Sequence, residues 1–395
     1  MSTDAASGLE RYLAARRAEV ESALTQYLPP AHTPPVLADA MRYSLLAGGK
    51  RLRPLLTLAA ADAAGGPDAR SLAMPAACAI EMIHTYSLIH DDLPAMDDDI
   101  LRRGRPTLHV VAGDGMAILA GDGLQAEAFG LLAREPFSHD PALVARKLRV
   151  IEIIAGAAGA AGMVGGQAID LGAAFGGKFS TAKGAFGAES PTAKTSSSKP
   201  GVAPQHAPSA SEGAFGAESP TAKTSSSKPG VAPRHAPSAS EGAFGARSPT
   251  AKTLSSKPGV ASPHQAAPFT ADDLEQMHAR KTGALIRASA VAGAIMAGAD
   301  EHVVTAIDRY AADIGLAFQI VDDVLDVEAA SQTLGKTAGK DAAAGKPTYP
   351  ALFGIARSRE LARECLERAE AELAAVRLDR SYLAGIAHWI VARRS

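Results

Sequence analysis

Two clusters of aspartates lie within segments that are otherwise apolar, and this placement constrains the fold more than any other feature of the chain. The first cluster holds five aspartates within nine residues, 91–99, and the second is the run DDVLD at 322–326. Carboxylates this crowded repel one another unless they are protonated or bind cations, and Mg²⁺ prefers carboxylate and water oxygens. Two such clusters predict a metal site rather than two solvated helix ends.

The second cluster lies in a predicted helix, because residues 311–327 carry apolar side chains at helical spacing with no Gly or Pro after Gly315. In a helix, Asp322 and Asp326 share one face, with their Cβ atoms about 5–6 Å apart. That distance allows the two carboxylates to hold one cation or two neighbouring ones.

The first cluster is less regular, because Pro94 lacks a backbone donor and should end or kink the helix that brings Ile80 to Asp92. Asp97 must then reach the site from beyond that break. Arg102 and Arg103 follow closely, and a guanidinium fork matches phosphate oxygens. Acid and base side by side indicate a site for a metal-bridged diphosphate.

The chain as a whole is predicted to be all-α, a large helical bundle around a central cavity. Hydrophobic residues make up 47% of it, aromatic residues are few, and no run of alternating β-branched residues predicts a strand. The lengths of the expected helices suit a bundle whose ligand site is lined by inward-facing side chains. The expected helices are Leu9–Gln26, Leu55–Ala64, Ser71–Asp92, Met116–Arg134, Pro141–Gly156, Asp272–Ala297, Glu301–Glu328 and Arg359–Val376.

An internal repeat interrupts this pattern. Three tandem copies of one unit begin at Gly184, Gly213 and Gly242, with a period of 29 residues. The unit is rich in Ser, Thr, Pro, Gly, Ala and Lys, and it lacks the apolar face that a stacked solenoid needs. We therefore expect one helical domain from residues 1–172 and 269–395, with residues 173–268 as a low-complexity, disordered insertion.

Composition also bears on location and partners. The N-terminus is charged and lacks the apolar core of a secretory signal, and the most apolar run, residues 153–164, is short and dominated by Ala and Gly. Cys78 and Cys365 are the only cysteines, too few for a disulfide framework or a zinc site. We expect a cytoplasmic protein with no membrane segment and no nucleic-acid partner.

Nine sequence blocks, in this order and spacing, make the chain similar to the trans-isoprenyl diphosphate synthases, and within them to the bacterial farnesyl diphosphate synthases. The blocks are GGKRLRP at 48–54, IHTYSLIH at 83–90, DDLPAMD at 91–97, LRRGRPT from 101, GGQAIDL from 165, KTGALIRAS from 281, FQIVDD from 318, DDVLD at 322–326 and GKTAGKDAAAGK from 335. The resemblance implies a Mg²⁺-dependent prenyltransferase with a deep central cavity, three Mg²⁺ ions when substrate is bound, and a homodimer. Its substrates would be isopentenyl diphosphate and an allylic diphosphate.

The resemblance also implies roles for individual residues. The Mg²⁺ ligands would be Asp91, Asp97 and Asp322, with Asp92, Asp323 and Asp326 completing the sites. The leaving diphosphate would be held by Arg102, Lys281, Lys336 and Lys346, and isopentenyl diphosphate by Lys50, Arg53, His84 and Arg103. Thr282 and Gln319 would stabilise the carbocation, with Gln167 and Asp170 extending that polar wall.

Product length would depend on the depth of the cavity below the first aspartates. The resemblance places the floor at Tyr86, five residues before Asp91 and about 7.5 Å along the helix. Helical geometry by itself places Ser87 closer to the stripe of Asp91, so both residues are candidates.

Three alternatives to a farnesyl diphosphate synthase stay open. A synthase making geranylgeranyl or longer products would share every motif. An inactive regulatory subunit of a partner synthase is disfavoured by the intact aspartates and lysines. A terpene cyclase would share the first motif, whereas the second motif here is of the synthase type.

Overall fold

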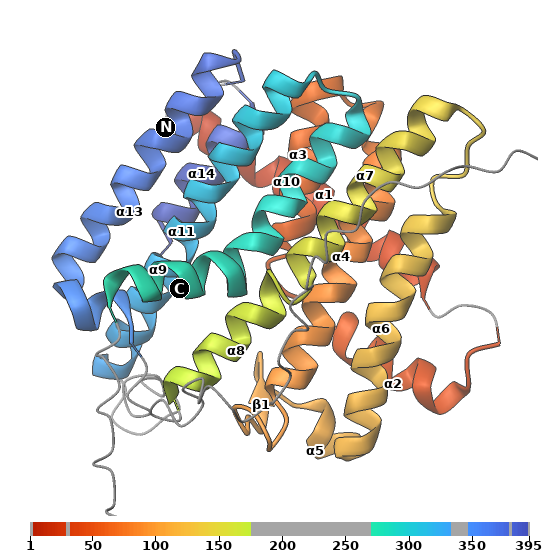
Figure 1. The fold of residues 1–395 in the computed structure, drawn as a ribbon, viewed down its shortest axis with the longest axis vertical. Helices are drawn as coiled ribbons and strands as arrows, with labels where there is room; N and C mark the ends of the chain where they lie inside the picture. Colours follow the sequence, from red (N-terminus) through yellow and green to blue (C-terminus); the bar gives the residue numbers. More distant parts are fainter. Residues whose placement is uncertain (1–2, 29–31, 175–269, 333–346, 379–380, 394–395) are drawn as a thin grey trace, which may run out of the picture. The chain divides into compact units, whose positions relative to one another are not determined.

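The computed structural model describes residues 3–28, 32–174, 270–332, 347–378 and 381–393, which build a helical bundle (Figure 1). The chain divides into two units, one of residues 1–182 with 265–395 and one of residues 183–264, and the described residues all belong to the first. Its helices are α1 (Thr3–Tyr27), α2 (Pro35–Leu45), α3 (Leu52–Gly65), α4 (Ala69–Asp91), α5 (Leu108–Ala112), α6 (Asp114–Arg134), α7 (Pro141–Ala158), α8 (Met163–Ala174), α9 (Ala271–His278), the π-helix η1 (Ala279–Gly283), α10 (Ala284–Ala297), α11 (Glu301–Gln332), α13 (Tyr349–Ala375) and α14 (Tyr382–Val391). Two short antiparallel strands, β1 (Leu101–Arg102) and β2 (Arg105–Pro106), form a hairpin. The predicted all-α fold class is confirmed.

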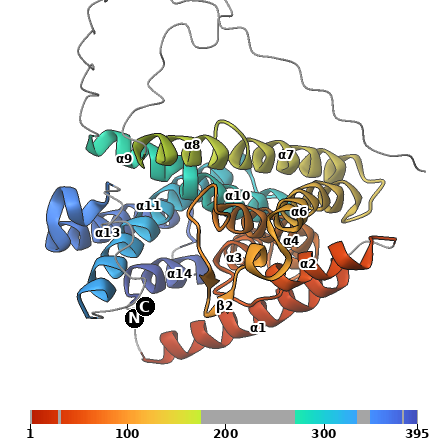
Figure 2. The same cartoon turned by 90° about the horizontal axis from the view of Figure 1, so that it is seen from below.

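Helix α10 occupies the centre of the bundle, where it packs against α3, α4, α7 and α11. Its sequence, ALIRASAVAGAIMA, is small and apolar nearly all round. Eleven of its residues are buried, namely Leu285, Ile286 and the nine from Ala288 to Met296. A helix that is apolar on every face is stable only inside a protein. Figure 2 shows α7, α8 and α9 on one side of the bundle and α1 on the other, with α10, α4 and α3 between them.

The helices that carry the two acidic motifs, α4 and α11, both pack against α10. This shared neighbour holds the motifs at a fixed separation although 230 residues lie between Asp91 and Asp322 in the sequence. Helix α4 ends at Asp91, three residues before Pro94, as the missing backbone donor of proline predicts.

The eight predicted helices are present, with three differences. The expected single helix 272–297 is divided into α9, η1 and α10, because a π-helical turn interrupts it at Ala279–Gly283. Helix α13 begins at Tyr349, ten residues earlier than expected, and contains a break at Gly354, whose φ is 79°. The third difference is that α2, α5, α8, α14 and the hairpin were not predicted. Helix α8, MVGGQAIDLGAA, is too rich in glycine for its sequence to predict a helix.

Both cysteines are free and buried. Among the described residues, three helical segments are long and apolar enough to cross a membrane, judged by length and composition alone: Ala69–Asp91, Asp114–Arg134 and Pro141–Gly172. This finding corrects the sequence argument, which had found no apolar run of sufficient length. In Ala69–Asp91, 72% of the apolar window is buried inside the bundle, so packing against other helices already accounts for its composition.

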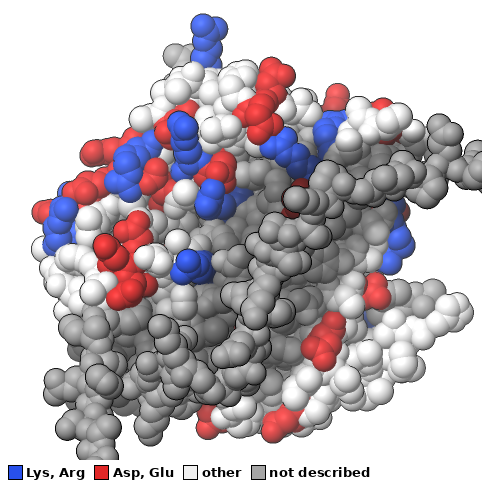
Figure 3. All heavy atoms as spheres, in the orientation of Figure 1, with Lys and Arg blue, Asp and Glu red and all other residues white. Residues whose placement is uncertain are grey.

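The surface is uneven in charge (Figure 3). Charged residues of both signs gather over α13 and α11, whereas the face over α5 and α6 is largely uncharged. Large apolar side chains are exposed there, among them Val110, Val111, Ile118 and Leu119, at 43–55%. Apolar side chains that are exposed together in one patch often mark a protein interface.

Candidate active site

A cavity of about 520 Å³ opens between α4, α8, η1 and α11. It brings together predicted site residues from segments far apart in the chain: Arg53, His84, Tyr86, Ser87, Asp91, Gln167, Lys281, Thr282, Gln319 and Asp322. The carboxylates of the two acidic motifs therefore face one cavity. Asp92, Arg102 and Arg103 instead line a small second hollow of about 40 Å³, which shares Leu88 with the first.

The turn after α4 folds back over the end of the helix. The backbone N–H of Asp97 donates to the carbonyl of Asp91 at 2.9 Å, so the two aspartates are adjacent despite the break before Pro94. Burial raises the pKa of Asp91 to about 6; the Lys281 ammonium opposes this rise and the Asp97 carboxylate adds to it. A carboxyl group in such surroundings favours a cation, which would restore its negative charge.

Asp92 points to a different partner. Arg102 Nε donates to both of its oxygens, at 2.7 and 2.9 Å, and Arg102 Nη2 lies 2.6 Å from Oδ1. The Asp92 side chain is only 5% exposed. This forked contact fixes the hairpin of β1 and β2 against the end of α4, so Asp92 positions Arg102 in this structure.

In the second motif, too, the adjacent aspartates have different surroundings. Asp322 lines the cavity, and Asp326 follows one turn later on α11. Asp323 is buried on another face, where its Oδ1 accepts from Gln319 Nε2 at 2.8 Å and its Oδ2 accepts from the backbone N–H of Tyr349 at 3.1 Å. Asp323 therefore orients Gln319 and ties the start of α13 to α11.

The donor set suits Mg²⁺. Among the described residues no group of three His, Cys, Asp or Glu side chains is close enough to enclose a metal ion. Mg²⁺ commonly takes one or two carboxylates and completes its shell with water and substrate phosphates. Asp91 and Asp322, which line one cavity from α4 and α11, fit that kind of site, with Asp97 beside the first.

The π-helix η1 delivers Lys281 and Thr282 to the cavity. Helix α8 approaches it so closely that a Cβ on Gly166 would lie 2.2 Å from the backbone nitrogen of Lys281, so only glycine fits there. This approach places Asp170 against Lys281, and the two side chains form an ion pair. Short π-helical segments are frequent at functional sites, because they turn side chains out of the regular helical register.

A polar chain crosses the cavity wall from η1 to α11. Thr282 Oγ1 donates to Gln319 Oε1 at 3.0 Å, and the Gln319 amide donates in turn to Asp323. These bonds fix the orientation of the Gln319 amide. The Gln167 amide lines the same cavity, and neither of its polar atoms has a hydrogen-bond partner among the described residues.

Arg53, at the start of α3, and His84, on α4, contribute to the basic part of the cavity lining. Burial lowers the pKa of Arg53 to about 10, and its Nε has no hydrogen-bond partner in the described part of the chain. Burial and the neighbouring arginines, Arg53 first, hold the pKa of His84 well below 6.5. His84 is therefore a neutral imidazole beside cations, a combination that suits an anionic ligand.

Arg393, just beyond α14, is a site residue that the sequence reasoning missed. Its Nη2 donates to Asp322 Oδ1 at 2.8 Å, and its guanidinium lies 4.5 Å from the centre of the Phe318 ring. Its side chain is 6% exposed. An arginine near the end of a chain carries no signal of such a contact, which depends on how α14 packs against α11.

The structure bears on the residues predicted for the cavity floor but not on two of the predicted diphosphate ligands. Tyr86 and Ser87 both line the cavity, so the structure leaves both as candidates for its floor, with Tyr86 only 7% exposed. Lys336 and Lys346 lie outside the described residues, and their predicted contact with a diphosphate stays a prediction.

The environment of His84 predicts how stability depends on pH. Unfolding frees the imidazole to take up a proton below pH 6.5, whereas the folded protein keeps it neutral, so His84 costs stability as the pH falls through 6.5. We expect wild type to lose about 1 kcal/mol more than His84→Gln between pH 7.5 and 5.5, measured by urea unfolding in EDTA. His139→Gln, at an exposed position, should follow wild type. Equal losses in wild type and His84→Gln would contradict the assignment.

Comparison with known proteins agrees with this geometry. The chain matches the family model of polyprenyl synthetase over residues 34–197 and 260–379. The farnesyl diphosphate synthase of Geobacillus stearothermophilus is 37% identical over 385 residues, covering 98% of each chain. The geranylgeranyl diphosphate synthase of Cyanophora paradoxa is 35% identical, covering 97% of this chain and 96% of that protein.

The fold agrees as well. A crystal structure of an FPP/GFPP synthase from Zymomonas mobilis is 31% identical, with a TM-score of 0.65 and coverage of 98% of this chain and 100% of that one. The family model spans most of the chain, and the relatives are aligned over nearly its full length. The chain is therefore a prenyltransferase and belongs to the polyprenyl synthetase family.

Proposed function

We propose that this trans-prenyl diphosphate synthase uses Mg²⁺ to condense isopentenyl diphosphate with dimethylallyl and then geranyl diphosphate, giving farnesyl diphosphate. The observation that carries the proposal is that Asp91 of α4 and Asp322 of α11 line one cavity that also receives Arg53, His84 and Lys281. Carboxylates for the cation and cationic groups for phosphates thus surround a mostly apolar space.

In the first step, the carbon–oxygen bond of the allylic diphosphate breaks and its electron pair leaves with the diphosphate. Mg²⁺ held by Asp91, Asp97 and Asp322 would neutralise the charge that develops on the leaving group. Lys281 and Arg102 would hold the departing diphosphate, and such contacts lower the barrier when they strengthen in the transition state. The fixed Gln319 amide and Thr282 hydroxyl would face the allylic cation without attacking it.

In the second step, the double bond of isopentenyl diphosphate attacks the cation and forms the new carbon–carbon bond. Lys50, Arg53, His84 and Arg103 would bind its diphosphate without a metal. Neutral His84 acts there as a hydrogen-bond donor rather than as a charge. Loss of a proton to the departed diphosphate completes the reaction, so no side chain has to serve as general base.

The proposal includes the length of the product, fifteen carbons. A bulky Tyr86 in the wall below Asp91 supports arrest at fifteen carbons. The second candidate function is a synthase of geranylgeranyl or longer products, since proteins named for farnesyl and for geranylgeranyl diphosphate are similar to this chain at 37% and 35% identity.

We also propose a cytoplasmic homodimer. The exposed apolar side chains of α5 and α6 support a second copy as the partner, since burying them would remove apolar area from water. The insertion is proposed to be an addition to a single catalytic domain, because the family match is interrupted between residues 197 and 260, within the repeat region.

The reaction itself is tested by incubating the purified protein with isopentenyl and dimethylallyl diphosphates and separating the products by chromatography. With Mg²⁺ we expect a fifteen-carbon product, and with EDTA a fall in turnover of about a hundredfold or more, because the leaving group then lacks its counter-charge. Equal turnover in EDTA, or none in Mg²⁺, would refute the proposal.

The role of Tyr86 is tested by Tyr86→Ala, which removes a phenol ring from the cavity wall. We expect products of twenty carbons or more, because the growing chain can extend into the vacated space. Ser87→Ala, which changes the neighbouring wall by only a hydroxyl, should leave the product length unaltered. If Tyr86→Ala still stopped at fifteen carbons, Tyr86 would not be the floor.

Deletion of residues 184–268 tests the insertion. We expect turnover within about threefold of the full chain, because chain length in a tolerant connection has a small effect on the rest of a fold. Deletion of residues 213–241 alone, one full period, is the matched control and should give the same result. A larger loss on complete deletion would assign the repeat a part in catalysis.

A further inference from the structure

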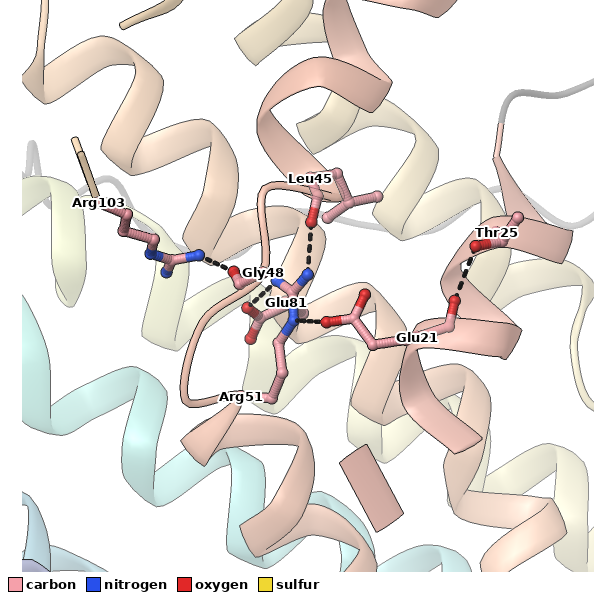
Figure 4. Close-up of polar contacts among 7 residues, drawn as sticks. All are labelled: Glu21, Thr25, Leu45, Gly48, Arg51, Glu81 and Arg103. Carbon is pink, nitrogen blue, oxygen red and sulfur yellow. Dashed lines mark hydrogen bonds and ion pairs between the residues drawn. The ribbon is translucent and has the colours of Figure 1, made fainter. Parts of the chain in front are cut away.

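Arg51 lies in the loop between α2 and α3, and each nitrogen of its guanidinium binds a different helix (Figure 4). Nε donates to Glu21 of α1 at 2.7 Å, and Nη1 donates to Glu81 of α4, also at 2.7 Å. Nη2 donates at 2.6 Å to the carbonyl of Leu45, the last residue of α2. Each of the three nitrogens is thus engaged by the protein, and the side chain is 0% exposed, so it is not accessible to a substrate.

The backbone of Arg51 depends on these contacts. Its φ and ψ are 51° and 34°, a left-handed conformation that disfavours residues with a Cβ. Such a conformation persists where the surroundings fix it, and here the Arg51 and Glu81 side chains are 0% and 2% exposed. The buried ion pair therefore sets the path of the chain immediately before α3.

That path carries the cations of the proposed second-substrate site. Lys50 precedes Arg51, and Arg53 follows it by two residues. On the other side of the ion pair, Glu81 lies three residues before His84, on the same face of α4. The Arg51–Glu81 contact thus joins the loop that bears Lys50, and the start of α3 that bears Arg53, to the helix that bears His84.

The fourth proposed ligand, Arg103, docks on the same loop. Its Nη1 donates to the carbonyl of Gly48 (Figure 4). A Cβ on Gly49 would lie 2.5 Å from the same nitrogen, so the loop is shaped to receive this guanidinium. The position of the loop consequently decides where Arg103 lies as well.

Glu81 is a buried anion among these cations. Burial lowers the pKa values of Arg53 and Arg103, and Glu81 opposes the fall in both. It therefore helps to keep several guanidinium groups charged and close together before an anionic ligand arrives.

We propose that Arg51 is a positioning residue for the second substrate, holding Lys50, Arg53, His84 and Arg103 in the arrangement that receives the diphosphate of isopentenyl diphosphate. It acts through the loop and does not touch substrate. This inference rests on the proposed function, since it concerns the metal-independent diphosphate pocket of the same site.

The test is Arg51→Lys, which keeps the positive charge but can satisfy fewer of the three partners. We expect KM for isopentenyl diphosphate to rise about tenfold, because small displacements of binding groups are costly. KM for the allylic diphosphate and kcat should stay within about twofold, since Asp91, Asp322 and Lys281 are held by other contacts. Steady-state kinetics with each substrate varied in turn gives these values.

Two matched variants separate positioning from other roles. Arg70 also pairs with carboxylates of α1 and α3, lying 3.9 Å from Glu19 and 2.6 Å from Asp62, but away from the loop. Arg70→Lys should lower the melting temperature without changing either KM. Glu81→Gln keeps an acceptor for Arg51 and removes the nearby negative charge. It therefore separates the effect of loop geometry on KM for isopentenyl diphosphate from the effect of charge.

The outcomes are distinct. If Arg51→Lys only lowers the melting temperature, as Arg70→Lys does, the role is structural and the proposal fails. If Arg51→Lys leaves KM for isopentenyl diphosphate unchanged while Glu81→Gln lowers it, Arg51 acts by charge and the proposal also fails.

If Arg51→Lys does not fold, Glu21→Gln, at a side chain 33% exposed, replaces it. Glu21→Gln should raise KM for isopentenyl diphosphate about threefold. No turnover by wild type would instead refute the proposed function.

Discussion

The structure depends on bringing carboxylates of two distant motifs into one cavity. Like charges brought together repel, and a carboxylate that is buried also loses hydration. The fold limits this cost by giving the two adjacent aspartates of each motif different surroundings. Asp91 and Asp322 face the cavity, whereas the next residues, Asp92 and Asp323, are paired with donors of the protein itself.

This division explains why a motif needs adjacent aspartates. Neighbouring residues on a helix project about 100° apart, so one carboxylate can reach the cavity while the next reaches into the surrounding structure. Asp92 fixes Arg102 in the hairpin, and Asp323 fixes Gln319 and the start of α13. Asp92 and Asp323 thereby hold groups that act beside the aspartates that line the cavity, Asp91 and Asp322.

Much of this arrangement could be predicted from the sequence. Apolar periodicity located the helices that carry both motifs, and Pro94 located the end of the first. The π-helical turn at Lys281 could not be predicted, because its sequence, ARKTG, has no proline and its one glycine is the last residue. The turn arises where Gly166 lets α8 press against it. The contact of Arg393 with Asp322 and the hidden roles of Asp92 and Asp323 depend on packing between helices, which local spacing does not encode.

The ion pairs around the cavity suggest how its charges are balanced before ligands bind. Asp170 pairs with Lys281, Arg393 with Asp322, and Glu81 with Arg51. A buried charge without a partner is far more costly than a paired one, so a site for a cation and two diphosphates must carry internal counter-charges. Two of these pairs include a residue proposed to bind a ligand, Lys281 or Asp322, and ligand charges can replace their partners. The pair at Arg51 includes no such residue, which is why it can hold its geometry while the others exchange partners.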